Sequence, residues 1–161
     1  MSIEQFAGIE IEEWPAKVAE TAMFLVDHQM NLELAEEFGL TPDRLPIKKM
    51  LNVRVANALT IDWREVCPIT DETLILGNPP FMGRLTRTPE QADDLKAAFH
   101  NSTGSGNIDY VCAWFARASD YLKHCTARAA FIATNSITQG EQPFVLWSYM
   151  QQNDEIGRAH V

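Results

Sequence analysis

The tetrapeptide Asn78-Pro79-Pro80-Phe81 is the part of this sequence whose residue types point most clearly to chemistry. It follows the apolar run Thr73 to Leu76 and Gly77, which is typical of a short buried strand. Because proline has no backbone N–H, two consecutive prolines end a strand and make the following turn rigid. An amide side chain and an aromatic ring are thereby held at the carboxyl end of the strand, where ligands bind in open α/β sheets.

The tetrapeptide, called the Asn-Pro-Pro-Phe motif below, suits a base that carries an exocyclic amine, such as adenine. The side-chain oxygen of Asn78 and the carbonyl of Pro79 can accept both N–H groups of the amine, which localises its lone pair and directs it at an electrophilic methyl group. The ring of Phe81 can stack on a base flipped out of a duplex. The competing interpretation is a plain turn, since Asn-Pro is a common turn signal, but the strand directly before the motif favours a site.

Short apolar runs alternate with amphipathic stretches around the motif, which predicts an α/β architecture with a mostly parallel sheet and helices on both faces. Residues 100–107, rich in Gly, Ser and Asn, are predicted to be a plain flexible loop. The patterns predict strands over 6–11, 51–55, 73–76, 129–133 and 156–161, of which the strand over 129–133 is also expected to be buried. They predict helices over 12–39, 89–99, 109–122 and 141–151.

Composition limits the classes of protein that the chain can represent. With 161 residues, 46% of them hydrophobic and 22% charged, it suits one folded domain of ordinary size. No apolar run approaches the roughly 20 residues of a membrane-spanning helix. The net charge of -9 argues against this surface alone gripping a phosphate backbone. A DNA enzyme remains possible if another domain supplies the basic cleft.

The other residues that could take part in chemistry are better explained by structural roles. The odd cysteine count and the spacing of Cys67, Cys112 and Cys125 predict no metal site and a reducing, cytoplasmic setting, with Cys112 buried in a helix. Asn135 and Ser136 end a predicted strand on the ligand side, where they either line the base pocket or form a turn. The four tryptophans, Trp14, Trp63, Trp114 and Trp147, are expected to pack in the core.

Longer stretches resemble one family, the MmeI-type restriction–modification enzymes, which carry an adenine-specific, S-adenosylmethionine-dependent DNA methyltransferase domain. The Asn-Pro-Pro-Phe motif matches the catalytic motif of amino-methylating DNA methyltransferases in general. The stretches that narrow the resemblance are Gly8 to Ala16, Asp27 to Asn31, Ile108 to Val111 and Ala129 to Gly140.

The resemblance implies a Rossmann-like class I S-adenosylmethionine-dependent methyltransferase fold and a role for each matching residue. Asn78, Pro79, Pro80 and Phe81 would bind and activate the flipped adenine. Glu10 would hold the ribose hydroxyls of S-adenosylmethionine and Ile11 would pack against its adenine, while Asn57 and Ala58 would contact the edge of that adenine. The alternatives are a helix-start acid for Glu10 and a strand-end turn residue for Asn57.

The sequence departs from the family at the cofactor loop, because only seven residues precede Gly8 and no glycine-rich loop comes before the first predicted strand. Thr103 to Asn107 resembles that loop in composition, but it lacks the strand before it that a cofactor-binding loop needs. Residues 1–161 are therefore expected to form a partial catalytic domain. It would run from the family's second strand to about the sixth, without the first strand that lies between the second and the fourth.

Several consequences follow for the isolated chain. We expect weak binding of S-adenosylmethionine, little or no activity alone, and contact with double-stranded DNA through the full-length enzyme. Unpaired strand edges would favour self-association. Two alternatives stay open: a protein or RNA methyltransferase of the same motif class, and an inactive remnant that serves as an interaction module. The sequence does not give the DNA recognition site.

Overall fold

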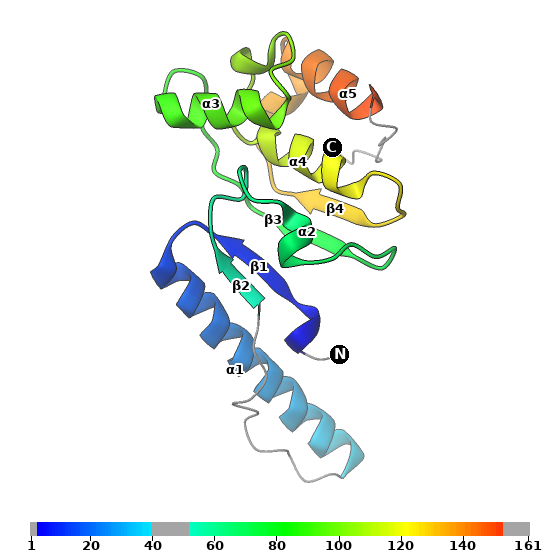
Figure 1. Ribbon diagram of the computed structural model, residues 1–161. Helices are drawn as coiled ribbons and strands as arrows, with labels where there is room; N and C mark the ends of the chain where they lie inside the picture. The colour runs from blue at the N-terminus through cyan, green and yellow to red at the C-terminus, as the bar shows by residue number, and fades with distance from the viewer. Residues whose placement is uncertain (1–2, 40–51, 153–161) are drawn as a thin grey trace. The chain divides into compact units, whose positions relative to one another are not determined.

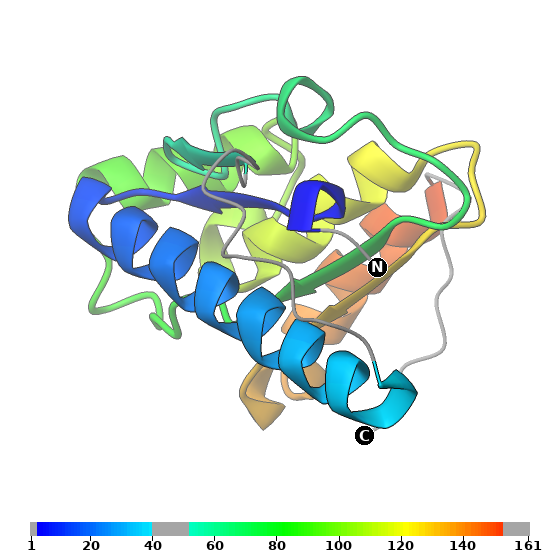
Figure 2. The ribbon, with the colours of Figure 1, turned by 90° about the horizontal axis from the view of Figure 1, so that it is seen from below.

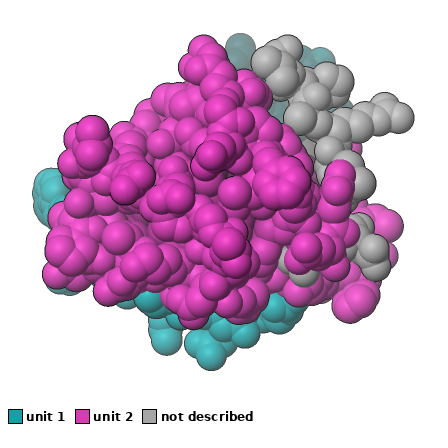
Figure 3. Space-filling model, turned by 90° about the horizontal axis from the view of Figure 1, so that it is seen from above, with its two compact units in different colours: residues 1–67 teal, residues 68–161 magenta. Residues whose placement is uncertain are grey.

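The structure is a computed structural model that describes residues 3–39 and 52–152. It divides into two compact units, residues 1–67 and residues 68–161 (Figure 3). The first unit contains η1 (Ile3–Gln5), β1 (Ala7–Glu10), α1 (Glu13–Phe38), β2 (Asn52–Val55) and α2 (Trp63–Val66). The second contains β3 (Leu74–Gly77), α3 (Pro89–Ala98), η2 (Ser105–Asn107), α4 (Cys112–Leu122), β4 (Arg128–Phe131), η3 (Asn135–Thr138) and α5 (Gln142–Gln152).

The first unit is a strand–helix–strand unit in which α1 connects two parallel strands and packs against them (Figure 1). The pairing runs from Ala7 opposite Asn52 to Glu10 opposite Val55. Gly39, at φ 63°, ends α1 in the left-handed conformation that glycine adopts without strain, and its N–H donates to the Ala35 carbonyl. Pro15 is the third residue of α1. It lies in the first turn, where its missing N–H costs no helical hydrogen bond.

The second unit places three helices beside a parallel strand pair (Figure 2). Strands β3 and β4 pair from Leu74 opposite Arg128 to Gly77 opposite Phe131. Helix α3 begins with a capping box in which the Thr88 hydroxyl accepts from the Gln91 N–H and the Gln91 side chain accepts from the Thr88 N–H. The apolar core of this unit consists of residues from α3, α4, α5 and their connections: Leu95, Ala98, Phe99, Ile108, Val111, Cys112, Ala113, Ala116 and Leu146.

The predicted strands β1 to β4 and the predicted helices α1, α3, α4 and α5 are confirmed. The mixed α/β class with parallel strand pairing is confirmed as well. In the part of the chain that the structure describes, the strands form two separate parallel pairs rather than one continuous sheet. The predicted strand over 156–161 lies outside the described residues. No described helix combines the length and the hydropathy that crossing a membrane requires.

The predicted burial of β3 and β4 is wrong. Leu74 and Leu76 are 62% and 80% exposed, and β4 is exposed from Arg128 to Ala130. Each strand belongs to a two-stranded sheet, and alternate residues of β3 point to a face that remains open. Trp14 departs from its predicted packing role as well, because its side chain on α1 is 77% exposed.

The connection before α4 is more ordered than we had predicted. Residues 100–107 include η2, and Ser105 is buried with its hydroxyl donating to the Ser102 carbonyl. Helix α4 begins at Cys112 rather than at residue 109. Residues 108–110, which precede its N-cap Val111, instead form hydrogen bonds to other parts of the unit.

Candidate functional site

The Asn-Pro-Pro-Phe motif begins directly after the last paired residue of β3. The Ile132 N–H donates to the Gly77 carbonyl at 3.0 Å, which closes the strand pair one residue before Asn78. Pro79 is buried, whereas Asn78 and Phe81 are exposed, with Phe81 at 48%. The buried proline therefore anchors a turn that presents an amide and an aromatic ring at the carboxyl end of a strand.

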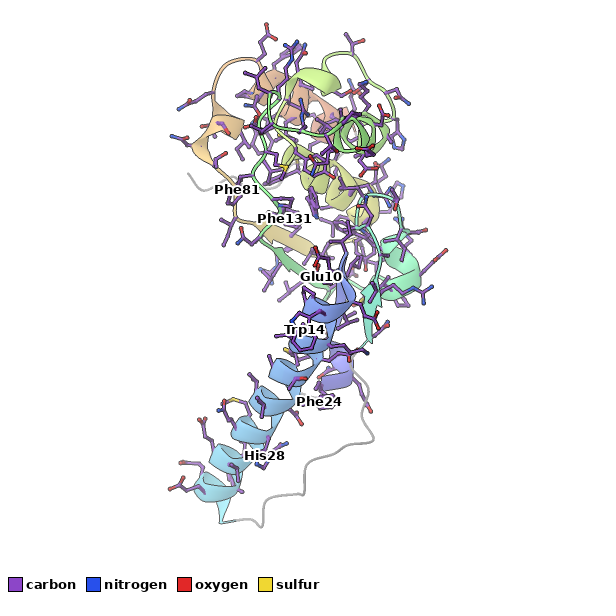
Figure 4. The ribbon with its side chains drawn as sticks, turned by 90° about the vertical axis from the view of Figure 1, so that its left-hand side faces the viewer. Glu10, Trp14, Phe24, His28, Phe81 and Phe131 are labelled. Carbon is purple, nitrogen blue, oxygen red and sulfur yellow. The ribbon has the colours of Figure 1, made fainter. Side chains whose placement is uncertain are left out.

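Gly77, the residue before the motif, permits a close approach by Phe131 of β4. A Cβ built on Gly77 would lie 3.0 Å from Phe131 Cδ1 and 3.1 Å from Cε1, distances that real side chains do not tolerate without movement. Phe131 also packs edge-on against Phe115 of α4, with ring centroids 5.2 Å apart. Figure 4 labels Phe81 and Phe131, which come from the neighbouring strand ends of this unit. The glycine thus lets an aromatic ring support the backbone that enters the motif.

The loop after β4 lies at the same edge of the strand pair, because parallel neighbours end on the same side. In that loop the Ser136 hydroxyl donates to Asp109 Oδ2 at 2.5 Å, and it lies 2.5 Å from the Thr134 hydroxyl. Asn135 is exposed, and its carbonyl accepts from the Thr138 hydroxyl. Both candidates from sequence belong to η3, where the Ser136 hydroxyl is part of a hydrogen-bond network and the Asn135 backbone carbonyl accepts from Thr138.

Residues 108–110 form hydrogen bonds to distant parts of the chain that the sequence did not predict. The Asp109 N–H donates to Gln142 Oε1 at 2.9 Å, and the Tyr110 N–H donates to the carbonyl of Met82, the residue after the motif, at 3.0 Å. The Arg87 guanidinium donates to the carbonyls of Ile108 and Gly106 at 2.9 and 3.0 Å. An acidic residue shortly before an apolar helix was the available signal, but sequence spacing says nothing of these long-range partners.

Burial keeps two neighbouring titratable groups, Cys112 and Tyr110, neutral. Burial, and next the negative charge of Asp109, raise the pKa of Cys112 to about 12. Burial, and next Asp94, raise the pKa of Tyr110 to about 12. Neither group ionises near neutral pH, so neither acts as a nucleophile or base there. Desolvation lowers the pKa of Arg87, which nevertheless stays cationic at neutral pH, and Asp109 opposes the shift.

The residues predicted to contact the cofactor meet at the carboxyl edge of β1 and β2 in the first unit. The Ala56 N–H donates to the Glu10 carbonyl at 2.9 Å, which brings the two strand ends together. The Glu10 carboxylate accepts from the N–H groups of Ile11 and Glu12 through Oε1, at 2.8 and 3.2 Å. Figure 4 labels Glu10 beside Trp14, the second residue of α1.

Asn57 and Ala58 form the turn after β2. The Asn57 side-chain oxygen accepts from the Leu59 N–H at 2.9 Å, and the indole N–H of Trp63 donates to the Ala58 carbonyl at 2.7 Å. The turn role that we had considered for Asn57 is therefore present. Ile11 is 64% exposed at the same edge, so an apolar surface lies next to the Glu10 carboxylate.

The comparisons with known proteins agree with this arrangement. The model of the family described as MmeI, DNA-methyltransferase domain, matches residues 1–161. The chain belongs to this family. It is 36% identical over 151 residues to DNA methyltransferase A of Bacillus subtilis (strain 168). The matched region covers 92% of the chain and 17% of that protein. It is also similar to a solved structure of the type IIL restriction–modification enzyme MmeI in complex with DNA, with 44% identity and a TM-score of 0.89 over 95% of the chain.

The MmeI DNA-methyltransferase family consists of DNA methyltransferase domains, a class of enzyme that requires a methyl donor. The chain spans about a fifth of the relatives it matches, 17% and 21% of their lengths. Within residues 3–39 and 52–152, no group of three His, Cys, Asp or Glu side chains is arranged to hold a metal ion.

Proposed function

We propose that the chain contributes the catalytic motif of a site-specific DNA adenine-N6 methyltransferase that uses S-adenosylmethionine, within a restriction–modification enzyme. The observation that carries the proposal is the Asn-Pro-Pro-Phe motif, directly after a paired strand, with Pro79 buried and Asn78 and Phe81 exposed. The methyltransferase domain, the cofactor S-adenosylmethionine and the substrate adenine are inferred from this motif together with the family. Description of the family as DNA-methylating favours DNA over protein or RNA as the substrate.

The exocyclic amine of adenine is a weak nucleophile because its lone pair is delocalised into the ring. Asn78 Oδ1 and the Pro79 carbonyl are the two acceptors proposed for the N–H groups of this amine, and Phe81 is proposed to stack on the flipped base. When bound, the donor supplies an electrophilic sulfonium methyl group. In such a transfer the N–C bond would form as the S–C bond breaks, the donor would leave as a neutral thioether, and the amine would release one proton to solvent. The chain's contribution is to orient the amine and hold it toward the methyl group.

The residues of the first unit fit the chemistry of S-adenosylmethionine. Glu10 offers a carboxylate that is oriented through Oε1 by two backbone N–H groups, which leaves Oε2 for a ribose hydroxyl. Ile11 is exposed and apolar, as packing against an adenine requires. Asn57 and Ala58, in a turn to which Trp63 donates a hydrogen bond, are proposed to contact the edge of that adenine.

We infer a Rossmann-like class I methyltransferase fold of which these residues form a part. The first unit would supply the family's second and third strands and the second unit its fourth and fifth. The two strand pairs are separate in the described residues, and the family's first strand would lie between its second and its fourth. Double-stranded DNA is the proposed partner of the complete enzyme. Because this chain has a net charge of -9, we propose that another part of that enzyme supplies the basic surface that binds the phosphate backbone.

Titration calorimetry with S-adenosylmethionine tests the cofactor site. The account predicts weak binding by the 161-residue chain and a further loss of about tenfold in Glu10→Gln, because a charged hydrogen bond to the ribose disappears. Glu13→Gln, at the start of α1, is the matched control and should bind as the unchanged chain does. Equal affinity of Glu10→Gln and the control would refute the role of Glu10. Nanomolar binding by the unchanged chain would refute the expectation of weak binding.

A further inference from the structure

Asp109 lies between the two loops that follow β3 and β4. Its Oδ2 accepts the Ser136 hydroxyl from the loop after β4. Its Oδ1 lies 3.9 Å from a Cβ built on Gly83, in the loop that carries the motif. The next residue, Tyr110, donates its N–H to the Met82 carbonyl, one residue beyond Phe81. One short segment therefore contacts both loops at the carboxyl edge of the strand pair.

The position of this segment is itself fixed from two further directions. Gln142, the first residue of α5, accepts the Asp109 N–H, and Arg87 donates to the Ile108 carbonyl. Ile108 and Tyr110, on either side of Asp109, are buried at 1% and 5% exposure. Because the backbone of Asp109 is held in place on both sides, its carboxylate can restrain the loops that it contacts.

We propose that Asp109 is a positioning residue of the base site: through Ser136 on one side and the Tyr110–Met82 hydrogen bond on the other, it holds the Asn-Pro-Pro-Phe motif against the loop after β4. This inference rests on the proposed function, in which that motif binds the flipped adenine. Asp109 touches neither base nor donor in this account. It acts by keeping Asn78 and Phe81 at the separation from the β4 loop that a bound base requires.

Alternative readings of Asp109 explain less. As a plain helix N-cap it would serve α4 through its side chain, but α4 begins at Cys112 and its N-cap, Val111, receives no side-chain hydrogen bond. As an ion-pair partner it would contact Arg87 directly, yet the Arg87 guanidinium donates to the backbone carbonyls of Ile108 and Gly106. The contact with Ser136, 27 residues away in the chain, is the one that the proposal explains.

Amide hydrogen exchange by NMR on the 161-residue chain tests the proposal. Asp109→Ala and Ser136→Ala should each speed exchange of the Tyr110 N–H by about tenfold, because the loop it holds gains freedom. Asp109→Asn, which still accepts from Ser136, should restore most of the protection. The Ile132 N–H, in the strand pair, should exchange as in the unchanged chain and thus reports that the fold is intact. Asp93→Ala, on the exposed side of α3, is the control.

Adenosine titrated into the same samples separates this inference from the proposed function. The side-chain amide of Asn78 should shift on titration, and Asp109→Ala should weaken adenosine binding by at least about fivefold through misplacement of the acceptors. If adenosine shifts no resonance of the unchanged chain, the proposed base site is refuted. Exchange of the Tyr110 N–H still tests whether Asp109 holds the motif in place. Unchanged Tyr110 exchange in both Asp109→Ala and Ser136→Ala, or an equal change in Asp93→Ala, would overturn the role of Asp109.

Discussion

At the scale of single residues, the candidate base site depends on small side chains as much as on the polar ones. Gly77 leaves room for the ring of Phe131 immediately before Asn78, and Pro79 is buried where the chain turns. Phe131 in turn packs on Phe115. The backbone that presents Asn78 is thus defined by packing from behind, while the amide itself remains exposed.

Gly77→Ala should disturb this packing. The added methyl group would meet the Phe131 ring at about 3 Å, so we expect a loss of about 1–3 kcal/mol in the free energy of unfolding from overpacking. Urea denaturation measures the change. Gly8→Ala in β1 is the matched control, because its Cβ would meet Val53 at 3.6 Å, an ordinary contact, and it should change stability by less than about 0.5 kcal/mol. Equal stability of the two variants would contradict the account.

At the scale of elements, periodicity and turn residues predicted β1 to β4 and the helices α1, α3, α4 and α5, but not the short helix α2 or the tertiary contacts. The apolar runs predicted β1 to β4, and Pro89 and Gly39 marked helix ends that the structure contains. Burial of β3 and β4 was predicted wrongly, because an apolar strand does not reveal whether anything covers its second face. The order of residues 100–107 was missed because it depends on Arg87, a residue in another loop.

Arg87 should stabilise the second unit through that loop. Arg87→Met keeps much of the aliphatic stem but removes the two hydrogen bonds to the Gly106 and Ile108 carbonyls, so we expect a loss of about 1.5–3 kcal/mol. Urea denaturation followed by circular dichroism would measure it. Arg84→Met is the matched control, because Arg84 is exposed in the same loop, and it should stay within about 0.5 kcal/mol of the unchanged chain. A stable Arg87→Met variant would show that the loop does not need its guanidinium anchor.

At the scale of the whole molecule, the sequence predicted the family and the parallel pairing, while the division into two units with separate strand pairs emerged only from the structure. Each pair has edges without a partner strand in the described chain, and Leu74 and Leu76 of β3 are largely exposed. Such edges are templates for pairing with another chain. The roles proposed for Glu10 and Asn78 belong to different units, and each is supported within its own.

We propose that the isolated chain self-associates through these edges. Sedimentation equilibrium should then show a mass that rises with concentration, and Leu76→Lys should shift it toward the monomer because a charged side chain disfavours strand addition. Leu85→Lys is the control, since Leu85 is 96% exposed in a loop outside the strands, and it should associate as the unchanged chain does. A monomer at every concentration would exclude this proposal.

The proposed function depends on activation of adenine by Asn78 for methyl transfer. We would measure transfer from S-adenosylmethionine to duplex DNA by a chimaeric enzyme in which residues 1–161 replace the matching segment of Bacillus subtilis DNA methyltransferase A. The account predicts N6-methyladenine as the product, and a loss of about a hundredfold or more in Asn78→Ala, because an acceptor that orients the amine is gone. The stability of that variant should be unchanged, since Asn78 is exposed. Transfer by Asn78→Ala within about twofold of the parent chimaera, or methylation of cytosine instead, would contradict it.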